Sequence, residues 1–478
     1  MVEVIFAVFA IASLLLFRFF APATAVTITC LAGWLILPVG NFPTGPSDAS
    51  VPYWIIGTAL PSDMLLTKMW WPPVIALAGA LLFDRKSFAE CQPRWIDVPM
   101  GLWCLWPMGQ AYFLESPDPQ AWISSIYLAA SWGVPWLLGR IYFSSSDGSK
   151  RLFGALVAGL VIIAPIALVE GSLGPRFYDW VYELHPFRFD GAQRYIGFRP
   201  LAFFENGNQY GIWVAATALA AIWLCQSTPN SRMRGWLGVV AVLALAIALI
   251  SQSAGAIFIL AGALTLFLLI GRAVMRWVMG LALLVIVSGG AVYLSGVVPL
   301  RAIADHTAIG RQVVEFVKST GRGSFTWRIA RDQRALPVIA EHPLVGSGRW
   351  DWWRKNGERP WGLVLLIIGQ FGLVGLALAF GSLLAPVART ITSHWHPGAW
   401  RMPSVALATI VLMGIADALL NSFFFYPAIL AAGAAAFPFP APSRQKVLTD
   451  HPRAVIANTQ PPYHHLTLRL GETKAQLA

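Results

Sequence analysis

The chain has 478 residues, of which 57% are hydrophobic and 12% are charged, and its formal net charge is +11. This balance excludes a soluble globular domain and an intrinsically disordered chain, because both classes carry a larger share of charged residues. The four cysteines have neither the spacing of a metal site nor that of a disulfide framework, which indicates small buried side chains.

Apolar runs of about 20 residues recur along the chain, long enough to cross a hydrocarbon core as helices. Their length, without alternation of polar and apolar residues, argues against a β-barrel. The sequence therefore predicts an all-α polytopic membrane protein in residues 1–438, followed by a flexible cytoplasmic tail in residues 439–478. The 12–13 predicted transmembrane helices cover residues 4–17, 22–39, 64–83, 95–114, 120–143, 152–171, 204–225, 236–250, 255–270, 277–296, 361–386, 402–420 and 426–437.

The short connections between these spans indicate the orientation of the chain, since Lys and Arg collect on the cytoplasmic side. The connections at 40–62, 115–119, 251–254 and 421–425 contain no Lys or Arg. The alternate connections hold Arg85, Lys86, Arg94, Lys150, Arg151, Arg232, Arg234, Arg272, Arg276, Arg389 and Arg401. This division predicts a cytoplasmic location for the basic set.

Two extended polar loops, residues 172–203 and 297–360, then lie outside the membrane as periplasmic loops. They hold 15 of the 34 Lys and Arg residues, against the usual distribution of positive charge. An anionic substrate such as the diphosphate of a lipid-linked sugar would explain this excess, because guanidinium groups bind phosphate oxygens bidentately. The alternative is that these cations contact anionic lipid headgroups.

The first loop carries Arg194 and Arg199 and leads directly into a predicted span. We expect both arginines to bind the substrate diphosphate, although Arg199 could instead extend to lipid phosphates. Glu205 and Asn206 follow at the start of the span, where polar groups are costly unless they face protein or water. They indicate a polar cavity, and capping of the helix is the alternative for Asn206.

The second loop contains a helix-like segment at 326–336 in which Arg328 is a further candidate for diphosphate binding. Pro337 is expected to kink or end this helix. A glycine-containing turn follows, with Arg349 as another diphosphate candidate. Further along the chain, Asp417 and Asn421 are four residues apart on one helical face, where they either line the cavity or bond to each other.

Four segments, taken in order, resemble the motifs of one family of membrane proteins. Arg199-Pro200 enters a span, and residues 251–256 read Ser-Gln-Ser-Ala-Gly-Ala. Arg328 is followed by His-Pro-Leu-Val-Gly-Ser-Gly at 342–348 and by Gly-Gln-Phe-Gly-Leu-Val-Gly at 369–375. Across about residues 194–427 the chain thus resembles the O-antigen ligase and Wzy-type polysaccharide polymerase superfamily. Residues 349–362 and 417–427 look closer to its exopolysaccharide polymerase-like members than to lipopolysaccharide ligases.

The resemblance implies a GT-C-like helical fold in the bacterial inner membrane, with an active site that faces the periplasm. It implies a glycosyltransferase that uses no metal or other cofactor and moves a glycan from undecaprenyl diphosphate to an acceptor sugar hydroxyl in surface polysaccharide biosynthesis. The expected partners are this lipid-linked glycan, an acceptor glycan or lipid, membrane lipids and other polysaccharide assembly proteins, without nucleic acid. Arginines suit this chemistry because they stabilise the charge that develops on the leaving diphosphate.

The chain departs from the family pattern at the position of the proposed catalytic histidine. Ligases carry a His-Asn pair ahead of the glycine-rich helix, where this chain has Trp361 and Gly362. The resemblance then leaves His342, Glu341 and Asp351 as candidates for the base that deprotonates the acceptor hydroxyl. Otherwise this chain does not perform the ligase reaction.

Two other functional classes stay open for a polytopic bundle with an arginine-lined cavity. A transporter or flippase for lipid-linked glycans is one, although the chain lacks the repeated halves typical of transporters. A non-catalytic membrane subunit of a polysaccharide export complex is the other, and the missing histidine favours it.

Overall fold

The structure is a computed structural model that describes residues 2–40, 51–53, 66–114, 120–187, 192–266, 274–295, 306–319, 324–357, 359–393 and 402–436. In these residues the regular secondary structure is helical, and β-type pairing is limited to a bridge between Gln193 and Phe198. The predicted tail at 439–478 lies outside the described residues.

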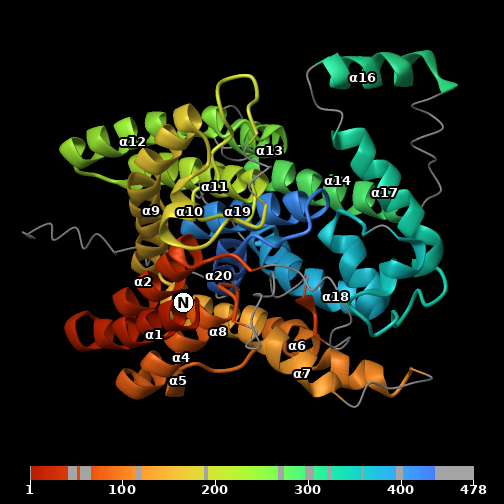
Figure 1. Cartoon of the computed structure of the whole chain (residues 1–478). Coiled ribbons are helices and arrows are strands. Elements are labelled where there is room, and N and C mark those ends of the chain that lie inside the picture. Colours follow the sequence, from red (N-terminus) through yellow and green to blue (C-terminus); the bar gives the residue numbers. More distant parts are fainter. Residues whose placement is uncertain are drawn as a thin grey trace, which may run out of the picture. The chain divides into compact units, whose positions relative to one another are not determined.

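The helices follow the chain in the order seen in Figure 1. The first part contains α1 (Val2–Phe19), α2 (Pro22–Ile36), α4 (Trp71–Phe83), α5 (Arg85–Ala89), η1 (Trp95–Asp97), α6 (Val98–Ala111), α7 (Ala121–Leu128), the π-helical turn η2 (Ala129–Gly133), α8 (Val134–Tyr142), α9 (Ser146–Leu173) and α10 (Phe177–Val181). The second part contains α11 (Gly207–Ser227), α12 (Ser231–Ile250), α13 (Ala254–Leu264), α14 (Met275–Ser295), α16 (Ala308–Ser319), α17 (Ser324–Ile339), η5 (Trp352–Asn356), α18 (Leu363–Thr392), α19 (Pro403–Ala418) and α20 (Tyr426–Ala435).

Each predicted span contains a described helix, which confirms an all-helical, multi-pass membrane protein. Within the described ranges, seven helical segments are long and apolar enough to cross a membrane, namely α1, α7 to α8, α9, α11, α12, α14 and α18. The shorter apolar helices α2, α4, α13, α19 and α20 complete the bundle. Helix α11 begins at Gly207, later than the predicted span at 204, so Glu205 and Asn206 precede it.

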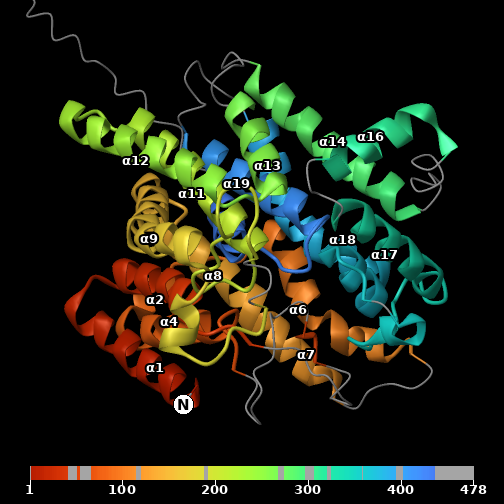
Figure 2. The same cartoon turned by 45° about the horizontal axis from the view of Figure 1, so that its top comes forward.

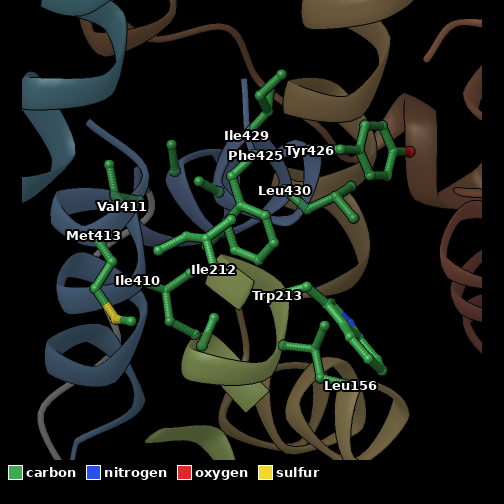
Figure 3. Close-up of a cluster of buried hydrophobic side chains, with 14 of the residues drawn as sticks. Leu156, Ile212, Trp213, Ile410, Val411, Met413, Phe425, Tyr426, Ile429 and Leu430 are labelled. Atoms are coloured by element: carbon green, nitrogen blue, oxygen red, sulfur yellow. The ribbon is translucent and has the colours of Figure 1, made fainter. Parts of the chain in front are cut away.

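The core of the bundle is formed by α11, α19 and α20, which lie centrally in Figures 1 and 2. Ile212 and Trp213 of α11, Ile410 of α19 and Leu430 of α20 are fully or almost fully buried and gather in one cluster (Figure 3). By contrast, α1, α12 and α14 bury little of their apolar surface. Long apolar helices with outward apolar faces are stable only where lipid covers them.

Helices α8 and α20 approach each other closely through paired glycines. A Cβ atom at Gly139 would collide with the carbonyl of Leu430, and one at Gly433 would collide with the carbonyl of Trp136. Small residues permit such backbone contact between membrane helices, which brings van der Waals packing and weak hydrogen bonds. This contact fixes α20, and through it the end of α19, in the bundle.

Helix α18 is interrupted at Gly372, whose φ of +70° is left-handed and therefore favours glycine. The turn at 343–348, between α17 and η5, replaces the hydrogen bonds that the interruption removes. The amides of Leu373 and Val374 donate to the carbonyls of Pro343 and Leu344, at 2.9 and 3.1 Å. The amides of Ser347 and Gly348 donate to the carbonyls of Gly369 and Gln370, each at 2.9 Å.

This pairing ties α17 to α18, which lie side by side in both Figures 1 and 2. Gln110 of α6 strengthens the junction, since its Nε2 donates to the carbonyls of Val345 and Gln370. Helix α17 extends two residues beyond Pro337 before it ends at Ile339. These hydrogen bonds attach the second polar loop to the membrane bundle at the C-terminal end of α17.

Candidate functional site

Arg199 is buried in the turn that leads into α11, with 4% of its surface exposed. Its Nη2 donates to Oδ1 of Asn208 at 2.6 Å, and Gly207 leaves room for the guanidinium group. Asn206 caps α11, because its Oδ1 accepts from the amides of Asn208 and Gln209. The side chain of Asn206 therefore orients the first turn of α11.

Asn421 connects Arg199 to Arg328 through neutral amide groups. Nδ2 of Asn208 donates to Oδ1 of Asn421 at 3.0 Å, and Nη1 of Arg328 donates to the same oxygen at 3.2 Å. Nη1 of Arg328 also donates to the carbonyl of Leu420 at 3.3 Å. An amide oxygen can accept both donors because it has two lone pairs.

Asp417 completes this arrangement at the C-terminal end of α19. Nδ2 of Asn421 donates to Oδ1 of Asp417 at 2.7 Å, and both side chains are almost fully buried. Of the two alternatives left open for this pair, the structure shows the bond between the two side chains, and Asn421 also accepts from Arg328. We call Arg199, Asn208, Arg328, Asp417 and Asn421 the arginine network.

The members of the arginine network come from chain segments that the charge distribution places on one side of the membrane. Asn208 starts α11, Asp417 ends α19, and Arg328 belongs to the second loop. Ser253, in the connection between α12 and α13, donates from its Oγ to Oδ1 of Asn208 at 3.3 Å. Their convergence agrees with the alternating topology inferred from the short connections.

Arg359 and Trp361 extend the network toward the start of α18. The guanidinium groups of Arg328 and Arg359 lie 5.0 and 5.2 Å from the ring centroid of Trp361. Nη2 of Arg359 donates to Oγ of Ser422 at 3.3 Å. Burial lowers the pKa of Arg359 to about 10, and the negative charge of Glu205 opposes this shift. The guanidinium remains protonated at neutral pH.

Sequence reasoning did not single out Arg359, Asn208 or Trp361. A signal was available for Arg359, because it stands just ahead of a predicted span, as Arg199 does. The side chain of Asn208 accepts from Arg199 and donates to Asn421, so it joins Arg199 to the rest of the network. Trp361 stands where the ligase family has histidine, and it provides a ring face for cations.

The turn at 201–205 is held by three buried side chains from other segments. The carboxylate of Glu170 accepts from the amides of Leu201 and Ala202, at 2.9 and 2.7 Å. Nζ of Lys68 donates to the carbonyl of Phe203 at 2.6 Å, and Nε2 of His185 donates to that of Phe204 at 2.8 Å. This support stabilises the left-handed conformation of Ala202, with φ of +47°.

Glu205 follows this turn and lies among cations. The carboxylate of Glu205 interacts electrostatically with the ammonium group of Lys68. Glu205 acts on Arg359 in the same way. Its carboxylate is therefore placed to compensate neighbouring positive charge.

The remaining predicted residues of the second loop form a separate surface cluster. Glu341, His342, Arg349 and Asp351 line a cavity of about 410 Å³. Arg349 pairs with Asp351, with 3.2 Å between Nε and Oδ1, and its side chain is largely exposed. Arg354 also pairs with Asp351, at 3.6 Å.

This surface cluster and the arginine network lie at opposite ends of α17. Arg328 and Ile339 are 11 positions apart, which corresponds to roughly 16 Å at the helical rise of about 1.5 Å per residue. His342 follows Ile339 in the turn beyond the helix. The structure therefore brings Arg199, Arg328, Asp417 and Asn421 together but places His342 with Glu341, Arg349 and Asp351 elsewhere.

Arg194 is exposed in the turn closed by the bridge between Gln193 and Phe198. Its backbone amide donates to the carbonyl of Gly197 at 2.8 Å. The side chain therefore faces outward at the edge of the first loop and does not share the buried position of Arg199.

An apolar groove of about 810 Å³ runs between α14, α17, α18 and α19. Its lining includes Leu336 of α17, Ile368 of α18 and Leu419, the residue that follows α19. The groove approaches the arginine network because Leu419 directly precedes Leu420, whose carbonyl accepts from Arg328. The arginine network and the apolar groove are thus adjacent.

No family model and no curated protein matches this chain. Among the residues that the structure describes, no group of three His, Cys, Asp or Glu side chains could hold a metal ion. The functional assignment therefore rests on the arginine network and the apolar groove.

Proposed function

We propose that this protein is a glycosyltransferase of the bacterial inner membrane that acts on its periplasmic face. It would move a glycan from undecaprenyl diphosphate to an acceptor sugar hydroxyl during surface polysaccharide biosynthesis. The observation that carries the proposal is the arginine network, in which amide side chains hold the buried Arg199 and the partly buried Arg328 beside an apolar groove.

The charge of this region supports binding of a diphosphate. Amide contacts orient a guanidinium group without cancelling its charge. Three arginines, Arg199, Arg328 and Arg359, converge on this region, and guanidinium groups bind the oxygens of a diphosphate through charge-assisted hydrogen bonds.

The apolar groove supports a lipid carrier over a soluble nucleotide sugar. A polyprenyl chain in the groove would hold its diphosphate at the arginine network, next to Leu419. The diphosphate is already a good leaving group, and the arginines would stabilise the charge that develops as the sugar departs. Binding and leaving-group stabilisation then use the same guanidinium groups.

Replacement of Arg199 or Arg328 by Ala tests this proposal. We expect each variant to insert in the membrane at wild-type levels and to abolish surface polysaccharide, because each lost charge-assisted hydrogen bond costs about 1.5–3 kcal/mol. Immunoblots of membranes and gel analysis of extracted polysaccharide give the two readouts.

The matched control is Arg232→Ala at the exposed start of α12, which should leave polysaccharide unchanged. Wild-type polysaccharide in both site variants would refute the mechanism. Deletion of the gene then separates the two outcomes of transfer. Single repeat units indicate a polymerase, and polymer that stays on its carrier indicates a ligase.

A further inference from the structure

Asp417 has one buried carboxylate oxygen that no described residue satisfies with a hydrogen bond. Oδ1 accepts from Nδ2 of Asn421 at 2.7 Å, whereas Oδ2 is buried without a hydrogen-bond partner among the described residues. Only 3% of the residue is exposed. A buried carboxylate oxygen without a partner costs on the order of 1–3 kcal/mol, so its presence suggests a ligand that completes it.

The other carboxylates near the arginine network are engaged in structural contacts. Oδ2 of Asp332 accepts from the hydroxyl of Tyr293, and Oδ1 accepts from the amide of Trp361, each at 2.6 Å. Glu205 lies between the charges of Lys68 and Arg359. Asp417 thus differs from both in offering a free acceptor oxygen.

A carboxylate at position 417 is also unfavourable for a site that only binds an anion. A carboxylate beside a diphosphate repels it, and the repulsion is stronger where water is excluded. A site that only bound the carrier would be improved by a neutral residue here. Asn421 nevertheless holds Asp417 and Arg328 on opposite ends of one amide, which sets a proton acceptor next to the phosphate-binding group.

We propose that Asp417 is the general base of the transfer reaction, an inference that rests on the proposed function. Oδ2 of Asp417 takes the proton of the acceptor hydroxyl while that oxygen forms a bond to the anomeric carbon of the donor sugar. The bond from this carbon to the diphosphate oxygen breaks, and its electron pair leaves with undecaprenyl diphosphate. Arg199 and Arg328 stabilise the charge on that leaving group.

This assignment supplies a base in a chain that lacks the histidine of the ligase pattern. His342, Glu341 and Asp351 lie beyond the far end of α17 and line a surface cavity. Asp417 reaches Arg328 through a single side chain. The base and the leaving-group stabiliser are therefore parts of one hydrogen-bonded unit.

The decisive variant is Asp417→Asn, which keeps an oxygen for Asn421 but cannot take up a proton at neutral pH. Two quantities are measured, namely the binding of undecaprenyl diphosphate by the protein in nanodiscs and the polysaccharide made by isolated membranes of the native bacterium. We expect binding equal to or tighter than wild type, and a rate of synthesis lower by roughly 10²–10⁴-fold. Asp147→Asn, at an exposed aspartate near the start of α9, is the matched control and should change neither quantity.

A pH profile adds a readout that a structural role would not affect. Synthesis by wild-type membranes should rise with pH as a carboxyl group loses its proton, and the residual activity of Asp417→Asn should lack that rise. Asp417→Glu retains the carboxylate and should recover part of the rate together with the pH dependence. This second variant keeps the test valid if the Asn variant folds poorly.

The results separate this inference from the proposed function. If wild-type protein does not bind undecaprenyl diphosphate, the proposed function falls and the inference falls with it. Wild-type rates of synthesis in Asp417→Asn overturn the inference alone. Loss of carrier binding in that variant also overturns it, because the carboxylate would then serve the structure of the site.

Discussion

His185 shows how one buried side chain fixes the turn that precedes the arginine network. Its Nε2 donates to the carbonyl of Phe204, and its Nδ1 accepts from the amide of Phe187 at 3.0 Å. Both contacts require the neutral imidazole with the proton on Nε2. Burial lowers the pKa of His185 to about 4, so this form persists at neutral pH.

A dependence of stability on pH follows from this shift. The unfolded chain, with a pKa of about 6.5, binds more protons than the folded protein between pH 6.5 and 4. The stabilisation is therefore present above pH 6.5 and is lost as the pH falls toward 4. We expect the thermal unfolding temperature of the protein in nanodiscs to decline across this window.

The variant His185→Gln should show a smaller decline, since an amide can make hydrogen bonds without titrating. His342→Gln is the matched control, because His342 is exposed and its replacement should leave the decline intact. Equal pH dependence in wild type and His185→Gln would contradict the assignment of the shift to His185.

At the scale of elements, the interruption of α18 is the least regular part of the fold. Gly372 has a left-handed backbone, and a Cβ atom there would collide with the carbonyl of Leu344. Gly381 lies in the same helix, where a Cβ atom would meet open space. A side chain is therefore excluded at position 372 but can be accommodated at position 381 of the same helix.

We expect Gly372→Ala to lower the free energy of unfolding by more than 1 kcal/mol, since strain in this backbone region costs about 1–3 kcal/mol. Gly381→Ala should be neutral or should stabilise the protein by about 0.5–1 kcal/mol, through the higher helix propensity of Ala. Thermal unfolding of both variants in detergent provides the comparison. A Gly372→Ala protein as stable as Gly381→Ala would exclude strain at this position.

The helices could be predicted from the sequence because apolar runs alone determine where a chain can cross lipid. The irregularities within them could not. The π-helical turn at Ala129–Gly133 and the interruption at Gly372 depend on neighbouring segments that complete the backbone hydrogen bonds. No local pattern of hydrophobicity encodes those partners.

The candidate site was predictable in part for a similar reason. Arg199 and Arg328 stood out as charges against the expected distribution. Their connection through Asn208 and Asn421 joins residues 213 positions apart, which only the packing of α11 against α19 brings together. The contact of Arg359 with Ser422 likewise joins residues 63 positions apart, which no local pattern encodes.

At the scale of the whole molecule, the proposed function requires the two polar loops to face the periplasm. Tyr195 in the first loop and Leu344 in the second loop are exposed. Asp147, at the N-terminal end of α9, is exposed as well. Single cysteines at these positions report their side of the membrane. The background protein would carry Ala in place of Cys91 and Cys225, which are partly exposed.

We expect a membrane-impermeant maleimide to label Tyr195→Cys and Leu344→Cys in spheroplasts. Asp147→Cys should react only after the membrane is permeabilised, because the basic connections are cytoplasmic in this topology. The reverse pattern would place the arginine network on the cytoplasmic side and would rule out a periplasmic transferase.

The hydrogen bonds between the 343–348 turn and α18 limit how α17 can move. Displacement of its C-terminal end would leave four amide groups without hydrogen-bond acceptors, at about 1–3 kcal/mol each. Release of a bound ligand from the arginine network would therefore involve the N-terminal part of α17, around Arg328, while its C-terminal end stays in place. Such a movement would also have to break the contacts of Asp332 with Tyr293 and Trp361.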